Sequence, residues 1–366
     1  YQVNEPDWDE LYAERARDFT TSFALGQPGA DAIGWDGTRE PRLFSKATPE
    51  ADLDIRLLDS EPAIPEKTPG AYRRLTVHAA DMNGVLAACD NGADAVIIGG
   101  EAWRPHRPWT LADIRRARRF THEYGVQLIV DTPRTTHQRE CSEMEHFFRA
   151  LNEINPAGLL VGNPGTMKIA KELTCLPIQT DFSFNLFNHR AARFLREQRT
   201  AMATVSLELS FPQLRSLAKH SFLPLEIIVH GATESMICDH NLPSLALGYA
   251  HPLDDPAFGD RRFALRDEAG GKHALRLDQY GRIHILFTKD LCLYPYLPML
   301  NGFASYRIEA QDYVPELTGR LTRLYREALN ALTGNTPTLD LEALAMLEKD
   351  SPRAFSSGVY RFRLSQ

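Results

Sequence analysis

Residues 75–100 read LTVHAADMNGVLAACDNGADAVIIGG, and this stretch decides the fold prediction. Two short apolar runs, Leu75–Ala80 and Ala95–Gly99, flank a helical stretch, and Gly92 lies where that helix would turn back into the second run. The second run is apolar at successive positions, which is typical of a parallel strand covered on both faces. The stretch therefore predicts a strand, a helix and a second strand of one parallel sheet.

The same rhythm continues along the chain. Six further runs predict strands at Gln127–Val130, Gly158–Val161, Pro177–Thr180, Thr204–Leu209, Leu225–Val229 and Ala304–Ile308. Helices fit between them, and Thr110 is a plausible helix cap with Asp113 three residues on. Eight such units predict an α/β fold, a (β/α)8 TIM-like barrel, and an open doubly wound sheet is the alternative.

The spacing predicts how the chain is divided. We expect an N-terminal extension and linker at 1–72, a barrel at 73–330 and a C-terminal tail at 331–366. Between the seventh and eighth strands lies an insertion, 232–303, in which Ala274–Leu277 and Arg282–Phe287 predict a β-hairpin. Such an insertion would lie over the C-terminal mouth of the barrel, where barrel enzymes carry out their chemistry.

A short internal similarity bears on the N-terminal extension. Arg17–Phe23 resembles Arg353–Val359, and the chain starts at Tyr1 rather than at a methionine. Either the similarity is chance, or the chain is cut from a tandem protein and residues 1–72 end a preceding module.

Composition narrows the class of protein. The chain of 366 residues is 43% hydrophobic and 24% charged, with a net charge of −7. That charge argues against a basic nucleic-acid coat, although it leaves room for one local basic face. We expect a cytoplasmic protein without a membrane span or secretory leader. Five scattered cysteines fit a reducing compartment.

Polar residues close the predicted strands, where a barrel places its catalytic groups. We predict catalytic roles for Asp181, Glu208 and His230. We predict substrate-binding roles for Glu101, Asp131, Asn163, Asn185, Asn188 and Glu309. The plainer alternative for each residue is that it caps a helix or binds loop amides.

Two cysteines of the insertion, Cys238 and Cys292, are the candidate metal ligands. With His240 they offer three ligands for zinc or iron, and a closed tetrahedral site needs a fourth. The alternative is two ordinary buried cysteines. The sequence holds no phosphate-binding glycine loop, no nucleophile elbow and no His-Glu-x-x-His helix.

Several motifs together resemble one known family. Leu75–Ala80 and Asn91–Gly100 resemble the first two strands of the peptidase U-32 (collagenase-like) family. Its later motifs have counterparts, in the same order, at Thr180–Asn188, Ser206–Ser210, Val229–Gly231 and Asp290–Cys292. The resemblance covers about Leu75 to Leu329 and implies a barrel scaffold.

The resemblance also implies chemistry. Several branches of the family hold a four-iron, four-sulfur cluster on four cysteines and hydroxylate RNA bases or quinone precursors without oxygen, and others carry a protease label. Here Ala232–Ser235 follows His230 and Gly231, Asn241 stands where many relatives have a cysteine, and Cys292 matches a ligand position. The resemblance therefore implies a divergent member that lacks most of the cluster cysteines.

Three functional hypotheses follow. The chain is an enzyme or enzyme subunit that acts on an RNA base or another small aromatic substrate at the barrel mouth. Alternatively, it is a non-catalytic, degenerate barrel that stabilises a homologous, cluster-bearing module or subunit. A collagenase-like protease is the third hypothesis. We predict no certain cofactor, with an iron–sulfur cluster or a single metal ion as the candidates.

Overall fold

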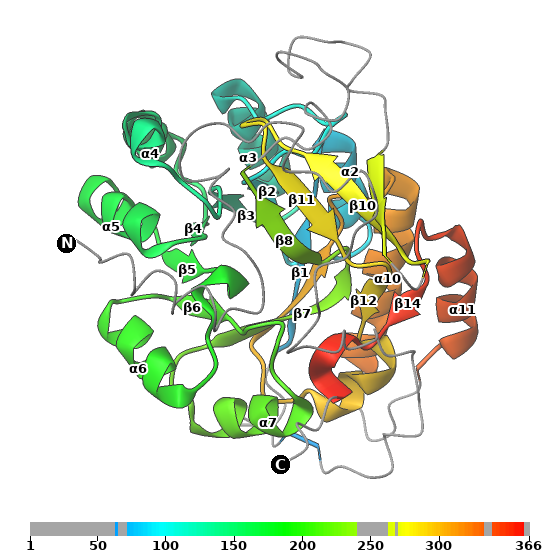
Figure 1. Ribbon diagram of the computed structural model, residues 1–366. Coiled ribbons are helices and arrows are strands. Elements are labelled where there is room, and N and C mark those ends of the chain that lie inside the picture. Colours follow the sequence, from blue (N-terminus) through cyan, green and yellow to red (C-terminus); the bar gives the residue numbers. More distant parts are fainter. Residues whose placement is uncertain (1–62, 65–71, 240–262, 268–269, 333–338, 362–366) are drawn as a thin grey trace, which may run out of the picture.

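The computed structural model describes residues 63–64, 72–239, 263–267, 270–332 and 339–361 (Figure 1). Eight parallel strands close into a ring there, because β13 pairs with β1 on one side and with β7 on the other. The strands are β1 (Arg74–His78), β2 (Ala95–Gly99), β3 (Gln127–Asp131), β4 (Gly158–Val161), β5 (Ile178–Thr180), β6 (Met202–Thr204), β7 (Leu225–Gly231) and β13 (Ser305–Glu309). This ring confirms the predicted barrel and excludes the open sheet.

Side chains of the strands alternate between the helix layer and the barrel interior. Val96 and Ile98 of β2 belong to the large apolar cluster shared with the helices. Ala95 and Ile97 belong instead to a small cluster with Ile129 and a residue of β4. The alternation thus gives each strand one face for the outer core and one for the interior.

The rest of the interior is polar. Glu226 of β7 is fully buried and accepts hydrogen bonds from Thr204 Oγ1 at 3.1 Å and from Ser305 Oγ at 2.7 Å. Arg307 of β13 lies 3.3 Å from the same carboxylate. A buried charge is tolerated when it is paired and hydrogen-bonded in this way.

Helices surround the ring with the predicted spacing. They are α2 (Met82–Asp90), α3 (Leu111–Glu123), α4 (Cys141–Ile154), α5 (Pro164–Leu173), α6 (His189–Glu197), α7 (Phe211–His220) and α10 (Pro315–Ala331). Thr110 caps α3 as predicted, since its Oγ1 accepts a hydrogen bond from the Asp113 amide at 3.2 Å. None of the helices among the described residues is long and apolar enough to cross a bilayer.

One predicted strand is wrong in extent. The run Thr204–Leu209 predicts a strand, but β6 ends at Thr204. Val205 and Leu209 are apolar because they pack into the outer core from the loop that leads to α7. Glu208 therefore lies on a loop at the barrel mouth.

The insertion forms a sheet of its own. Strands β8 (Glu234–Cys238), β9 (Phe263–Arg266), β10 (Lys272–Leu277) and β11 (Ile283–Leu286) pair in the order β8-β11-β10-β9. The β10–β11 pair confirms the predicted hairpin. The sheet lies against the loop after β2. The backbone amide of Arg104 donates a hydrogen bond to the Leu277 carbonyl, and the Ala102 amide donates one to Gln279 Oε1.

The chain then returns to the barrel. Strand β12 (Asp290–Cys292) pairs antiparallel with β7, and η5 (Tyr294–Met299) leads to β13. The described part of the predicted tail packs on the barrel through α11 (Leu341–Asp350), β14 (Phe355–Ser356) and η6 (Gly358–Arg361). Strand β14 pairs with β12, and Phe355 belongs to the outer core. Most of residues 1–72 lie outside the described residues, as does the tandem similarity at Arg17–Phe23.

Candidate functional site

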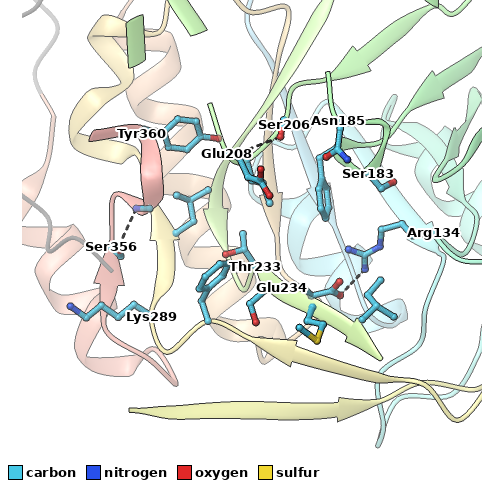
Figure 2. A pocket seen from close by; sticks show the side chains of 18 of the residues that line it. Arg134, Ser183, Asn185, Ser206, Glu208, Thr233, Glu234, Lys289, Ser356 and Tyr360 are labelled. Carbon is cyan, nitrogen blue, oxygen red and sulfur yellow. Dashed lines mark hydrogen bonds and ion pairs between the residues drawn. The ribbon is translucent and has the colours of Figure 1, made fainter. Parts of the chain in front are cut away.

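A cavity of about 360 Å³ opens at the C-terminal mouth of the barrel, beneath the insertion sheet (Figure 2). Barrel loops, the insertion and the C-terminal segment all contribute to it. Its lining comprises Arg134, Thr135, Phe182, Ser183, Asn185, Ser206, Leu207, Glu208, Thr233, Glu234, Ser235, Met236, Ile237, Phe287, Lys289, Leu291, Ser356, Gly358 and Tyr360. Most of the exposed lining is apolar, and a few polar groups point inward, as is usual in small-molecule sites.

The loop after β5 forms one wall. Asp181 precedes η4 (Phe182–Phe184), and Asn185 ends it in the left-handed conformation at φ 50°. Ser183 donates its hydroxyl proton to the Gly162 carbonyl at 2.6 Å, which ties this loop to the loop after β4. The turn leaves the Phe182 ring and the Asn185 amide at the cavity.

Arg134 is the central charge of this pocket. Its amide donates to Glu101 Oε1 at 2.6 Å, and its Nη2 lies 3.3 Å from Glu101 Oε2 and 2.7 Å from Glu234 Oε1. Its guanidinium carbon lies 5.1 Å from the centroid of the Phe182 ring. Figure 2 shows Arg134 paired with Glu234 across the cavity from Tyr360. Two carboxylates and one aromatic ring thus fix the guanidinium plane.

A buried histidine of the insertion supports that arrangement. His284 Nδ1 lies 2.9 Å from Glu234 Oε1, and its Nε2 lies 3.3 Å from Asp278 Oδ2. Burial opposes the charged ring, but the Glu234 charge and the hydrogen bonds to both carboxylates raise the pKa of His284 to about 9. A charged His284 therefore links the insertion sheet to Arg134 at neutral pH.

Below the pocket lies a chamber of about 20 Å³, enough for one water molecule. His78 Nδ1 lies 2.9 Å from Glu309 Oε2, and its buried Nε2 lies 3.9 Å from Asp131 Oδ2. Arg307 Nη2 donates to Asp181 Oδ1 at 2.6 Å. The pocket and the chamber adjoin, because both are lined by Arg134, Phe182, Leu207, Thr233 and Glu234.

Two carboxyls of the chamber have pKa values shifted in opposite directions. Burial, together with the nearby charges of Asp181 and Glu101, raises the pKa of Asp131 well above its usual range. Burial also acts on Glu309, but Arg307 and His78 lower its pKa to about 2. The pKa values of the two carboxyls are thus shifted in opposite directions, as in acid/base pairs whose members have different roles.

Five of the nine predicted catalytic and binding residues line the two cavities. Asn185 and Glu208 line the pocket, and Asp131, Asp181 and Glu309 line the chamber.

The remaining predicted binding residues have structural contacts. Glu101 holds Arg134, and Asn163 and Asn188 accept backbone hydrogen bonds as the caps of α5 and α6. The capping alternative thus describes the two asparagines.

His230 lies elsewhere and does not face Asp181 and Glu208. A register shift in β7 aligns Ile228 with Arg307 but His230 with Ile308, so one extra residue turns the His230 side chain to the outer layer. Its Nδ1 lies 3.2 Å from Tyr325 Oη, and burial lowers its pKa to about 3. The bulge removes His230 from the candidate acid/base set.

Comparison with known proteins fits this architecture. The sequence model described as "Peptidase family U32" matches residues 80–365. The chain belongs to peptidase family U32.

Three relatives are similar over most of their length. The tRNA hydroxylation protein P1 of Bacillus subtilis (strain 168) is 25% identical over 78% of this chain and 71% of its own length. An uncharacterized protease of Methanocaldococcus jannaschii is 24% identical over 77% of this chain and 71% of the relative. The tRNA hydroxylation protein P2 of Bacillus subtilis is 21% identical over 69% of this chain and 84% of the relative. Among solved structures, a U32 peptidase aligns with a TM-score of 0.42 and 12% identity over 69% of this chain and 97% of that chain.

The cysteines of this U32 member do not fit the four-cysteine cluster that the resemblance implied for several branches of the family. Cys292 is fully buried beside Tyr325 Oη, 3.9 Å from its sulfur, and burial raises its pKa to about 12. Cys238 packs in a separate apolar cluster of the insertion sheet with Leu275 and Ile283. The other three are on α2, at the start of α4 and before β5: Cys89, Cys141 and Cys175.

The two predicted ligands therefore lie in different clusters. Within the described ranges, no three His, Cys, Asp or Glu side chains are grouped so as to hold a metal ion, and His240 lies outside those ranges. The residues present thus do not support the predicted metal site.

Sequence reasoning missed Arg134, Glu234 and His284. Arg134 lies in a loop three residues after the predicted strand-end carboxylate Asp131, which was the available signal. Glu234 and His284 lie on neighbouring strands that pair only after the insertion has folded. Their proximity depends on that pairing and has no counterpart in local spacing.

Proposed function

We propose that this U32 protein binds an RNA base, or a similar planar aromatic group, in the mouth pocket, as an enzyme or enzyme subunit of RNA modification. The observation that carries the proposal is the Arg134 guanidinium over the Phe182 ring, 5.1 Å from its centroid, in a cavity of about 360 Å³. Flat aromatic and guanidinium faces are the surfaces on which proteins stack unpaired RNA bases. Two relatives named as tRNA hydroxylation proteins support the choice of RNA.

The polar lining suits the edge of a base. Asn185 offers both a donor and an acceptor, and Glu208 offers an acceptor, from two adjacent loops. An unpaired base presents donors and acceptors along its edge, and these can be read when the base is splayed out of its strand. The pocket thereby offers a stacking face and an edge-reading side.

Chemistry in the chamber below would use protons. Asp131, whose pKa is raised by burial and by the charges of Asp181 and Glu101, lies 3.9 Å from His78 Nε2, in a space of one water molecule that Arg134 also lines. In the proposed role, this pair moves a proton to or from a base held above it. No redox step is assigned to the cysteines, because their positions do not fit a cluster.

The cysteine positions favour one further candidate, a non-catalytic barrel that supports a cluster-bearing homologous module. Iron and sulfide determination after anaerobic purification tests whether this chain binds an iron–sulfur cluster. We expect no stoichiometric iron in this chain. About four irons per chain would reject the conclusion that the cysteines cannot hold a cluster.

A protease role has less support from the pocket. Ser183 and Ser235 each donate their hydroxyl proton to a backbone carbonyl, at 2.6 Å and 3.0 Å. A serine nucleophile needs a neighbouring base to take that proton, and the residues that line the pocket include no histidine. Intact gelatin after prolonged incubation with the protein is the expected result.

Binding of the four ribonucleosides, measured by calorimetry, tests the main proposal. Phe182→Leu keeps an apolar side chain but removes the ring, and stacking of one base is worth about 1–3 kcal/mol. We expect about tenfold weaker binding or more. Phe187→Leu is the matched control, because Phe187 lies in the same loop but outside the pocket lining. Equal effects of the two variants would reject the stacking role of Phe182.

A further inference from the structure

The outer helices α6 and α7 carry a basic strip. From His189 to Phe222 the sequence holds six arginines and lysines against two glutamates, in a chain whose net charge is −7. We define the strip by its exposed cations, Arg190, Arg193, Arg196, Arg199 and Lys219. Positive charge therefore exceeds negative charge by four in this segment of an acidic protein.

Exposed aromatic rings lie among these cations. Phe222 is 86% exposed and Phe194 is 56% exposed, and Phe222 is the most exposed large apolar side chain in the described part of the chain. The Arg196 guanidinium carbon lies 5.7 Å from the centroid of the Phe222 ring. The ring centroids of His189 and His220 are also 5.7 Å apart. These contacts join α6 and the end of α7 into one surface of cations and rings.

The strip starts at the pocket. Helix α6 begins at His189, four residues after the pocket residue Asn185, and α7 begins at Phe211, three residues after the pocket residue Glu208. The two helices lie side by side on the outside of the barrel (Figure 1). Barrel helices start at the mouth and run down the outer wall. The strip thus leads from the pocket along the outer surface.

We propose that the basic strip binds the RNA backbone next to the base held in the pocket. This inference rests on the proposed function and adds a docking surface to it. Lysine and arginine neutralise phosphates and release counterions, and exposed rings stack flanking unpaired bases. A combination of cations and aromatic faces beside a base-sized cavity fits single-stranded or looped RNA.

A second basic run in the chain provides the control. Arg115, Arg116 and Arg119 of α3 are also exposed. However, Arg115 lies 4.0 Å from Glu153 of α4, and α3 packs beside α4, which holds three glutamates. The neighbouring acidic residues reduce the attraction of this run for phosphate, so it carries matched charge without the proposed role. In the strip, Arg193 lies 2.9 Å from Glu197, so it is left out of the test variant.

The test compares two triple variants of the full chain. One is Arg190→Gln, Arg196→Gln and Lys219→Gln, and the other is Arg115→Gln, Arg116→Gln and Arg119→Gln. Binding of fluorescently labelled bulk tRNA is measured by anisotropy at several salt concentrations, and thermal melting verifies that both variants fold.

We expect the strip variant to bind at least tenfold more weakly. The slope of log affinity against log salt should fall by about 2, since each lost phosphate contact on a single strand contributes about 0.7. The α3 variant should stay within about twofold of the parent. Equal losses in the two variants, or no loss in the strip variant, would overturn the inference.

Other occupants of the strip give distinct results. Loss of binding to phosphatidylglycerol vesicles with unchanged RNA binding would indicate a membrane surface instead. Residues 1–62 are rich in aspartate and glutamate, and their faster proteolysis in the strip variant, with unchanged RNA binding, would indicate that this segment covers the strip. Either result would overturn the proposal.

The proposed pocket function and the proposed docking surface can be rejected independently of each other. If nucleosides bind in a Phe182-dependent way but the strip variant binds tRNA normally, the docking surface is wrong and the pocket function stands. If nucleosides do not bind but the strip variant loses tRNA binding, the pocket function is wrong and the surface stands.

Discussion

His284 provides the sharpest physical test of how the pocket is held together. It lies fully buried between Glu234 and Asp278, and its pKa is raised to about 9 from an ordinary value of 6.5. Glu234 in turn pairs with Arg134. Replacing the ring by His284→Gln removes the charge that joins the insertion sheet to the pocket arginine.

The sign and size of the effect follow from proton linkage. A base whose pKa is raised on folding stabilises the protein fully below pH 6.5, and this stabilisation is lost as the pH rises through about 9. Each pKa unit corresponds to about 1.4 kcal/mol, so the contribution is about 3 kcal/mol. The difference in unfolding free energy between parent and His284→Gln should therefore shrink by about that amount between pH 6 and pH 9.5.

Urea denaturation at several pH values measures this difference in unfolding free energy directly. Titrating groups that the substitution does not affect contribute equally to parent and variant, so their contributions cancel. A buried pair is screened little by salt, so the same difference should persist at 0.5 M sodium chloride. A difference that stays flat from pH 6 to pH 9.5 would refute a charged His284 in the folded protein.

Three further predictions concern the rest of the barrel. His230→Phe should make the protein less sensitive to acid. Burial lowers the pKa of His230 to about 3, so the parent loses up to about 5 kcal/mol of unfolding free energy as the pH falls from 6.5 toward 3. Parallel plots of unfolding free energy against pH for parent and variant would contradict this. Gly231→Ala should cost several kcal/mol, since its Cβ would lie 2.1 Å from the Glu309 carbonyl oxygen at a φ of +124°, whereas Gly125→Ala, with no atom within 4 Å, should cost only about 1 kcal/mol by thermal melting. Iodoacetamide at pH 8 should label exposed Cys175 in the native protein and buried Cys292 only after unfolding; rapid native labelling of Cys292 would show that its position is wrong.

The barrel could be predicted because its signals are local and repeated. The apolar run Ala95–Gly99 and the Thr110 cap each specify one element from a few neighbouring residues, and eight such units leave few ways to pack. The β10–β11 hairpin was also found locally, from its turn at Asp278–Gly281. Each of these elements is specified by residues close to one another in the sequence.

The errors in the candidate site have non-local causes. A single extra residue in β7 reverses the direction of His230, and this bulge appears only in the pairing with β13. Strand β8 is largely exposed, so its apolar pattern is weak, yet it brings Glu234 to Arg134. Tyr360 reaches the pocket from the end of the chain through the short pairing of β14 with β12. Such contacts depend on long-range pairing that residue spacing does not encode.

Photocrosslinking tests the central claim most directly. A tRNA transcript containing 4-thiouridine is bound to the full chain and irradiated, and the adducts are mapped by mass spectrometry. We predict adducts on the pocket peptides that contain Phe182, Phe287 or Tyr360, and their loss in competition with unlabelled tRNA. Adducts confined to surfaces away from the mouth pocket, such as the α3–α4 face, would contradict the claim that an RNA base enters this barrel.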